Sequence, residues 1–254
     1  MRILYQFPLS HYCEKARWIL DYKQLNYVAH NLIPGVHRAF AQLKTGQGTL
    51  PILKDQGNWI ADSTLIALYL DEHYPEHPLL KSNQYLRDQA LETNLLATTL
   101  GEHVRRWGLA HSLSKSDESL EIMIGEKGYL RQFEKFSKPI LKSLVTKNYQ
   151  LNDENVQASK LQIDNIVAQL NQQLLENGGK YLIGARLGLA DIAVCSMLAP
   201  LLELESTPWE KEFGAESSEQ FELYKAELLS LPLGQYVKRT YANERNARVD
   251  WRGV

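Results

Sequence analysis

The sequence contains little cysteine. It has 254 residues but only two cysteines, Cys13 and Cys195. Two cysteines exclude a disulfide framework and a four-cysteine zinc site, and they leave open a single bridge between them. The seven histidines are scattered, and none stands at ligand spacing from a cysteine. The sequence therefore predicts no metal site.

A long hydrophobic run and an excess of one charge are also missing. The longest apolar stretch, residues 189–202, contains Asp191 and is shorter than a membrane span, so we interpret it as a buried helix. The apolar run at the N-terminus is cut by Pro8 and is too short for a signal peptide. The 28 basic and 30 acidic residues give a net charge of −2, which attracts neither nucleic acid nor an anionic membrane. We expect a soluble, cytoplasmic protein with no membrane span and no nucleic-acid partner.

The first 76 residues alternate between strand-like and helix-like segments. An Asp-Gln-Gly turn at residues 55–57 joins the last two strands into a hairpin. The order βαβαββα predicts a small α/β domain over residues 1–76. The expected strands cover residues 2–7, 26–32, 51–54 and 58–61, and the expected helices cover residues 11–23, 35–44 and 63–74.

The second half of the chain has a helical pattern. Residues 75–82 contain two prolines and are interpreted as a linker. The pattern beyond them predicts an all-α domain over residues 83–245. Residues 113–154 are rich in Lys, Glu and Ser with weak periodicity, which indicates a surface insertion. The expected helices cover residues 84–112, parts of 118–148, 155–177, 188–205, 218–230 and 233–245.

Residues Ser10 to Cys13 follow the first expected strand and open the first expected helix. Free backbone N–H groups and the positive end of the helix dipole point at this place and stabilise a thiolate bound there. The Ser10 hydroxyl can donate to such a thiolate and lower its pKa, although serine is equally a common N-cap. Cys13 lies one turn further on, so we expect a small buried hydrophobic residue. His11 and Tyr12 are expected to be exposed or half-packed.

A Gly-Thr-Leu-Pro motif at residues 48–51 precedes the third expected strand. Pro51 is either an ordinary turn residue or a cis-proline that exposes the neighbouring backbone to a ligand. In the second case Leu50 offers its N–H and C=O groups to an extended peptide, as one strand pairs with another. Thr49, Leu50 and Pro51 are therefore candidate binding residues.

Asp62 and Ser63 stand at the start of the third expected helix. They form either a plain helix cap or a site in which Ser63 and nearby N–H groups bind a carboxylate while Asp62 binds an ammonium group. A γ-glutamyl group carries both charges on one carbon. A thiol site, a peptide-backbone site and an amino-acid site, in this order within one βαβαββα unit, together describe glutathione.

In these motifs the sequence resembles the glutathione transferase superfamily. Ser10-x-x-Cys13 is similar to the motif of the serine-type classes, in which the serine activates the glutathione thiol. Pro51 matches the cis-proline of the family's thioredoxin-like domain, and the Asp62–Ser63 pair matches the acidic residue and serine that hold the γ-glutamyl end.

The second half resembles the same family. Residues 181–184 (Tyr-Leu-Ile-Gly) and 189–193 (Leu-Ala-Asp-Ile-Ala) are similar to its folding motif, in which an Asp closes a helix N-terminus. The resemblance implies a thioredoxin-like domain followed by a helical-bundle domain, glutathione as co-substrate, a small electrophile as second substrate, and a homodimer. The electrophile of such an enzyme lies between the two domains. If the first long helix, residues 84–112, faces that cleft, then His103, Arg106 and Trp107 line the pocket for the electrophile. Surface charge and packing explain these three residues more simply.

The sequence departs from the family's pattern at four places. Gly188 stands where the family usually has Ser or Thr as an N-cap. Gln6 occupies the tyrosine position of the tyrosine-type classes, which leaves Ser10 as the activator. The loop before Pro51 lacks an evident basic residue for the glycine carboxylate, and the segment 113–154 lengthens the helical domain. Candidates for the missing carboxylate contact are His37, Arg38 and Lys44.

Two other functions stay open from the sequence. If Cys13 is the reactive group, the chemistry is thiol–disulfide exchange or deglutathionylation. The segment 113–154 and the missing carboxylate contact instead favour a non-catalytic binding or scaffold protein that keeps the fold.

Overall fold

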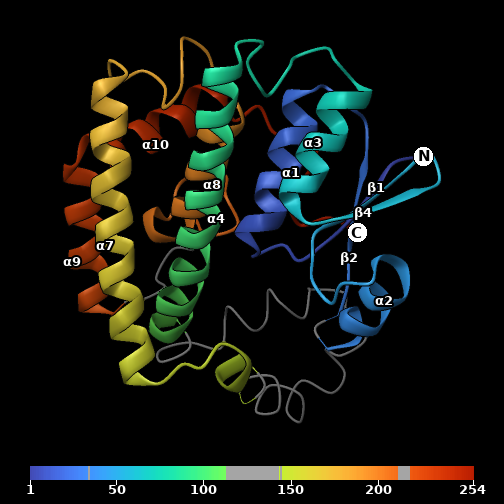
Figure 1. Ribbon diagram of the computed structural model, residues 1–254. Helices are drawn as coiled ribbons and strands as arrows, with labels where there is room; N and C mark the ends of the chain where they lie inside the picture. The colour runs from blue at the N-terminus through green and yellow to red at the C-terminus, as the bar shows by residue number, and fades with distance from the viewer. Residues whose placement is uncertain (34, 113–142, 144, 211–217) are drawn as a thin grey trace.

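The computed structural model describes residues 1–33, 35–112, 143, 145–210 and 218–254. An α/β half with the N-terminus lies beside a helical half, and the chain returns to the α/β half at its C-terminal end (Figure 1). This is the predicted fold, a thioredoxin-like domain followed by a helical bundle. Most of the segment 113–154, interpreted above as an insertion, lies outside the described residues.

The α/β half is built on a four-stranded mixed sheet. Its strand order is β2-β1-β3-β4, with β1 parallel to β2 and antiparallel to β3. Leu4 and Leu53 pack with α1 and α3, whereas Ile52 packs with Ala41 of α2 on the opposite face. The elements are β1 (Ile3–Gln6), α1 (His11–Tyr22), β2 (Val28–Asn31), α2 (Val36–Thr45), β3 (Ile52–Asp55), β4 (Asn58–Ala61) and α3 (Ser63–His73).

The register of the sheet brings the three sequence motifs to the same end of the sheet. Tyr5 near the end of β1 is paired with Ile52 at the start of β3, and Ile52 is paired with Ala61 at the end of β4. The residues that follow β1, precede β3 and follow β4 therefore share one end of the sheet. Those residues are 7–10, 48–51 and 62–63.

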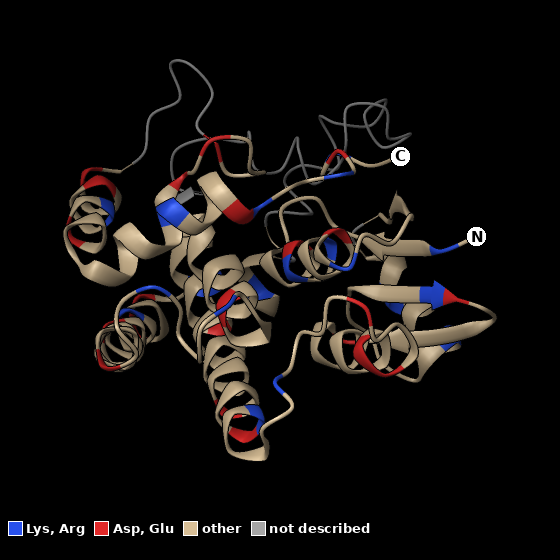
Figure 2. Cartoon of the chain, turned by 90° about the horizontal axis from the view of Figure 1, so that it is seen from above, with Lys and Arg blue, Asp and Glu red and all other residues tan. Residues whose placement is uncertain are grey.

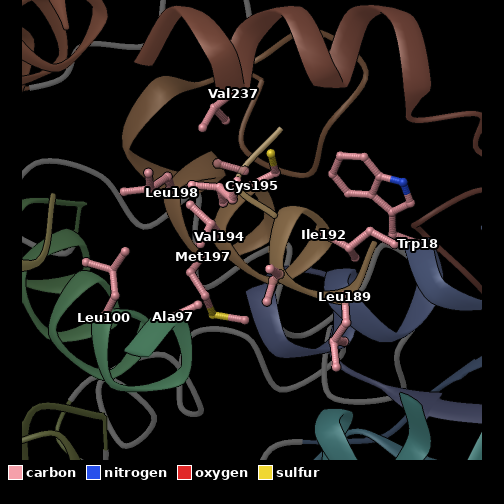
Figure 3. Packing of buried hydrophobic residues seen from close by; sticks show 14 of the residues in the cluster. Trp18, Ala97, Leu100, Leu189, Ile192, Val194, Cys195, Met197, Leu198 and Val237 are labelled. Carbon is pink, nitrogen blue, oxygen red and sulfur yellow. The ribbon is translucent and has the colours of Figure 1, made fainter. Parts of the chain in front are cut away.

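Helix α8 is the centre of the helical half and is buried on nearly every side, as predicted for residues 189–202. Figure 3 shows its side chains between Ala97 and Leu100 of α4, Trp18 of α1 and Val237 of α10. Because α1 packs directly on α8, the two halves share one hydrophobic core. The helices of this half are α4 (Gln84–Ser112), α7 (Asp153–Glu176), α8 (Leu189–Leu202), α9 (Glu219–Ser230) and α10 (Pro232–Glu244).

The start of α8 is closed by the chain itself. Asp191 accepts hydrogen bonds from Leu182 N at 2.8 Å, Gly188 N at 2.9 Å and Tyr236 Oη at 2.5 Å. Burial raises the pKa of Asp191 to about 6, although these three donors act in the opposite direction. A Cβ on Gly188 would lie 2.8 Å from Leu79 O, so the close approach of the linker explains why Ser or Thr is absent at this cap.

The C-terminal residues tie the helical half to the α/β half. Arg245 forms ion pairs with Glu14 at 2.7 Å and with Asp21 at 2.8 Å, both on α1. Burial alone raises the pKa of Glu14, but Arg245 and Arg17 outweigh it and lower the pKa to about 2. Val254 then exchanges backbone hydrogen bonds with Ala29 and Asn31 at the edge of β2.

No part of the described chain stands out in charge or in hydropathy over the length of a membrane span. Positions of basic and acidic residues alternate along both halves of the described chain (Figure 2). None of the described helices has both the length and the apolar composition that a membrane crossing needs. The described residues also contain no cluster of His, Cys, Asp and Glu side chains suited to a metal ion.

Candidate functional site

Ser10 caps helix α1 with a hydroxyl whose hydrogen can donate to a nearby sulfur. Its Oγ accepts a hydrogen bond from Cys13 N at 3.3 Å, and its side chain is half-buried. Because the hydroxyl accepts from the backbone, its own hydrogen can donate; it acts on the Cys13 thiol and can turn instead to an anion beside the helix N-terminus. The cap and the thiol-activating donor are thus compatible roles of one side chain.

Gln6 is fully engaged elsewhere. The side chain is completely buried. Its Oε1 accepts from Arg17 Nη1, and its Nε2 donates to Asn31 Oδ1 at 3.1 Å and to the carbonyl of Trp251 at 2.9 Å. The residue at the tyrosine position of the tyrosine-type classes is therefore a structural link to β2 and the C-terminal residues, and it has no group left for a thiol.

Cys13 is buried, as predicted. Its Sγ accepts from Phe7 N at 3.4 Å, and burial raises the pKa of its thiol. A buried, protonated thiol is a poor nucleophile. Cys195 is buried as well, and both cysteines are free, so the bridge left open by the sequence is absent.

The expectation that His11 is exposed or half-packed is wrong. Only 3 % of its surface is exposed, and its ring packs against that of Tyr12 with centroids 4.5 Å apart. Burial and the nearby Arg105 lower the pKa of His11 to about 3, so the ring is neutral. A Cβ on Gly101 of α4 would approach His11 Nε2 at 3.0 Å. This contact between the two halves buries the residue, and no pattern in the N-terminal sequence indicates it.

The Leu50–Pro51 peptide bond is cis. Pro51 O accepts from Asp62 N at 3.2 Å, which joins this loop to the start of α3. Thr49 is exposed and Leu50 is half-buried. Within the described part of the chain, no hydrogen bond uses the N–H or C=O of Leu50. The backbone beside the cis-proline is thus available to an extended ligand.

The start of α3 contains a buried polar group without a partner. Asp62 caps the helix from a left-handed backbone conformation, with φ of 72°, and its Oδ1 accepts from Thr64 N at 2.7 Å and Leu65 N at 3.1 Å. Ser63 is 1 % exposed, yet its Oγ has no hydrogen-bond partner among the described residues. An unsatisfied buried hydroxyl is costly, and at a helix N-terminus it suits an anionic ligand.

Lys15 lies directly behind this helix start, and no motif in the sequence points to it. The lysine is completely buried, and its Nζ donates to Thr64 Oγ1 at 3.0 Å and to Asn94 Oδ1 at 2.6 Å. Burial lowers the pKa of Lys15 to about 8, and Asp62 opposes that shift. Only the packing of α1 against α3 and α4 reveals this position, because a lysine in a helix is usually solvated.

The three residues proposed for an acceptor pocket on α4 face the helical half. Trp107 is 1 % exposed and stacks on Phe221 with ring centroids 5.5 Å apart. Arg106 and His103 both contact Ser159 Oγ on α7, at 2.8 Å and 3.3 Å. Packing, the simpler interpretation of these residues in the sequence, therefore explains all three, and none of them is needed for an acceptor pocket.

Arg105 is the α4 cation that faces α1. Its guanidinium lies over the rings of Tyr12 and Tyr149, at 5.5 Å and 4.6 Å from their centroids.

Of the candidates for the glycine carboxylate, His37 packs edge-on against Phe7 at 4.7 Å and Lys44 lies over Trp59 at 5.0 Å. These contacts do not select one of them.

Two family models match the chain. Residues 4–78 match the model "Glutathione S-transferase, N-terminal domain". Residues 134–226 match the model "Glutathione S-transferase, C-terminal domain". The second match begins inside the segment 113–154.

Curated relatives match over shorter stretches. Glutathione S-transferase 1 of Dianthus caryophyllus is 40% identical over 91 residues, which are 35% of this chain and 40% of the relative. A zeta-class glutathione S-transferase of Euphorbia esula is 37% identical over 83 residues, which are 32% of this chain and 37% of the relative. The matches thus span about two fifths of the length of these relatives.

Solved structures share the fold over nearly the whole chain. A glutathione S-transferase of Methylobacterium radiotolerans, in complex with glutathione sulfonate, has a TM-score of 0.63 at 17% identity and covers 98% of this chain and 94% of its own. The β-etherase LigF of Sphingobium has a TM-score of 0.62 at 19% identity and covers 96% of both chains. With both family models matched in chain order and the thioredoxin-like and helical halves in place, this chain belongs to the glutathione transferase superfamily.

Proposed function

We propose that this chain is a serine-type glutathione transferase that activates the thiol of glutathione for attack on a small electrophile. The observation that carries this proposal is the half-buried Ser10 hydroxyl at the N-terminus of α1, which accepts from Cys13 N and can turn its own hydrogen from the Cys13 thiol to a bound thiolate. The free N–H groups of the first helical turn add to the stabilisation of that thiolate.

The energy required for this activation is within reach of the site. A free thiol has a pKa of about 8.5 and is only a few per cent ionised at neutral pH. Lowering the pKa by about two units needs about 2.7 kcal/mol. A charge-assisted hydrogen bond contributes about 1.5–3 kcal/mol, and the helix dipole adds to it.

The other two residues of glutathione have matching partners at the same end of the sheet. The cysteinyl backbone pairs with the unused N–H and C=O of Leu50, between Thr49 and the cis-Pro51. The γ-glutamyl group takes the N-terminus of α3, with its carboxylate on the unpartnered Ser63 hydroxyl and its ammonium group on Asp62. Similar structures solved with glutathione sulfonate or with two bound glutathione molecules support this choice of ligand.

We also infer a cytoplasmic homodimer. Two free, buried cysteines fit a reducing compartment. Leu65 on α3 and Leu95 on α4 are 48 % and 67 % exposed, and the residues before them, Thr64 and Asn94, are hydrogen-bonded to each other. These two exposed leucines supply apolar groups for a subunit contact. A sedimentation measurement on Leu65→Glu tests this, with a shift to monomer expected.

Conjugation kinetics with a chromogenic aryl halide test the activity. Ser10→Ala is expected to lower kcat/KM by about 10²-fold, because losing about 2.7 kcal/mol of thiolate stabilisation corresponds to that factor. Ser10→Thr, which keeps both cap and hydroxyl, should retain most of the activity. Since the alanine variant also loses a cap contribution of about 0.5–2 kcal/mol, its folding is checked by circular dichroism.

Cys13→Ser separates this function from the cysteine-based alternative. The buried thiol with its raised pKa predicts unchanged conjugation in this variant. Loss of activity in Cys13→Ser together with full activity in Ser10→Ala would reverse the assignment. An intact wild-type fold that binds no glutathione would favour the non-catalytic alternative.

A further inference from the structure

Three cationic side chains are fully buried among the described residues, and they differ in how their charge is balanced. Arg17 forms an ion pair with Glu14 at 2.8 Å, and Lys23 forms one with Asp71 at 2.8 Å. Lys15 has no ion pair within the described ranges, and its ammonium donates to two neutral oxygens instead. Lysine is almost never fully buried without a paired charge.

The surroundings of Lys15 are themselves short of negative charge. The ammonium lies behind the N-terminus of α3, where the helix dipole is also positive. Among the described residues, the carboxylate that acts on it is that of Asp62, whose Oδ1 already accepts from two backbone N–H groups. An unbalanced buried cation beside a helix N-terminus is unfavourable, so a bound anion here would be stabilised.

Thr64 connects the buried cation to this helix start. Its Oγ1 accepts from Lys15 Nζ at 3.0 Å and from Asn94 Nδ2 at 3.1 Å. A hydroxyl oxygen has two acceptor positions, and both are occupied by these donors. The hydroxyl hydrogen of Thr64 is therefore left to donate to a third group, and the neighbouring Ser63 Oγ, 1 % exposed, also has no partner among the described residues.

We propose that Thr64 binds the α-carboxylate of the γ-glutamyl group alongside Ser63, and that Lys15 is the buried countercharge that positions and polarises the Thr64 hydroxyl. This inference rests on the proposed function and assigns two residues to it that the sequence motifs do not contain. Asn94 of α4 completes the arrangement, so the helical half of the protein contributes to recognition of the glutamyl end.

Calorimetric titration with two ligands tests this role. Glutathione is compared with 4-aminobutyryl-cysteinyl-glycine, which lacks only the α-carboxylate. Lys15→Met removes the charge at similar length, and Thr64→Val removes the hydroxyl at similar volume. Both variants are expected to weaken glutathione about tenfold or more and to change the affinity for the analogue less than about twofold, because only glutathione carries the group that they recognise.

Lys23→Met is the matched control, since it removes a buried lysine of the same chain region whose charge is already paired. It is expected to lower stability and to leave the ratio of the two affinities unchanged. If Lys15→Met does not fold, Thr64→Val tests the same step, and Thr64→Ser should restore the preference for glutathione.

An equal loss for both ligands, or no loss for either, in Lys15→Met and Thr64→Val would overturn the proposal and leave the buried lysine as a packing element. That result would leave Ser10 as thiol activator untouched. Wild-type protein that binds neither ligand would overturn this proposal together with the proposed function.

Discussion

Helices α3 and α8 begin in opposite ways, although both starts resemble ordinary caps in the sequence. At the start of α8 the capping groups are paired inside the protein: Asp191 accepts three hydrogen bonds, and Gly188 leaves room for the linker carbonyl of Leu79. At α3 the Ser63 hydroxyl is buried without a partner, and Lys15 behind it is a cation without an ion pair among the described residues. The comparison teaches that a structural cap consumes its polar groups, whereas a binding site keeps some of them for a ligand.

The largest expected effect is on the free energy of unfolding, at the start of α8 where Asp191 pairs the capping groups. Asp191→Ala leaves two backbone N–H groups and the Tyr236 hydroxyl buried without an acceptor, so the free energy of unfolding should fall by about 3–5 kcal/mol at pH 7. Urea unfolding followed by circular dichroism measures this loss. A loss below about 1 kcal/mol would contradict the assignment of α8 as the closed, structural end.

The same carboxyl predicts a pH dependence of stability. Burial raises the pKa of Asp191 to about 6 from its ordinary value of 3.8. The folded state therefore binds the proton more tightly than the unfolded state, and the associated stability is complete below pH 3.8 and is lost as the pH rises through 6. Between these values the contribution falls by up to about 3 kcal/mol.

Urea titrations of wild type and Asp191→Asn between pH 4 and 7 isolate this contribution. Other groups, such as Glu14 with its pKa lowered to about 2, are common to both proteins and cancel in the difference. A difference between the two proteins that does not change with pH in this window would contradict the raised pKa.

Ser63→Ala tests the open start at α3. Because the hydroxyl has no internal partner, stability should change by less than about 1 kcal/mol, whereas glutathione affinity should fall about 10- to 100-fold for a charge-assisted bond of about 1.5–3 kcal/mol. Ser159→Ala is the matched control, since Ser159 is equally buried but accepts from Arg106. Ser159→Ala should lose stability and keep its affinity for glutathione. If Ser63→Ala lost stability and kept its affinity for glutathione, the contrast between the starts of α3 and α8 would be wrong.

Local sequence signals were sufficient for most of the fold. The α1 start after Ser10, the hairpin around residues 55–57 and the α3 start at Ser63 were predicted within a residue or two, because caps, turn residues and short apolar runs depend on adjacent residues only. The cis peptide before Pro51 followed from the family resemblance.

Contacts between the two halves could not be predicted in the same way. Lys15 and His11 are buried because α4 covers α1, and Trp107 faces the helical core because of how α4 is rotated. Each of these outcomes depends on partners that are far away in the sequence. The position of Gly188 was predicted, but its reason, the carbonyl of Leu79, required the packed linker.

The most direct test of the account is the ionisation of glutathione on the protein. Thiolate absorbance in the ultraviolet is followed across pH for glutathione bound to wild type and to Ser10→Ala. The account predicts that wild type lowers the thiol pKa by about two units from its free value of about 8.5 and that Ser10→Ala returns it close to that value. Bound glutathione with an unshifted thiol, or the same shift in both proteins, would contradict the role of Ser10.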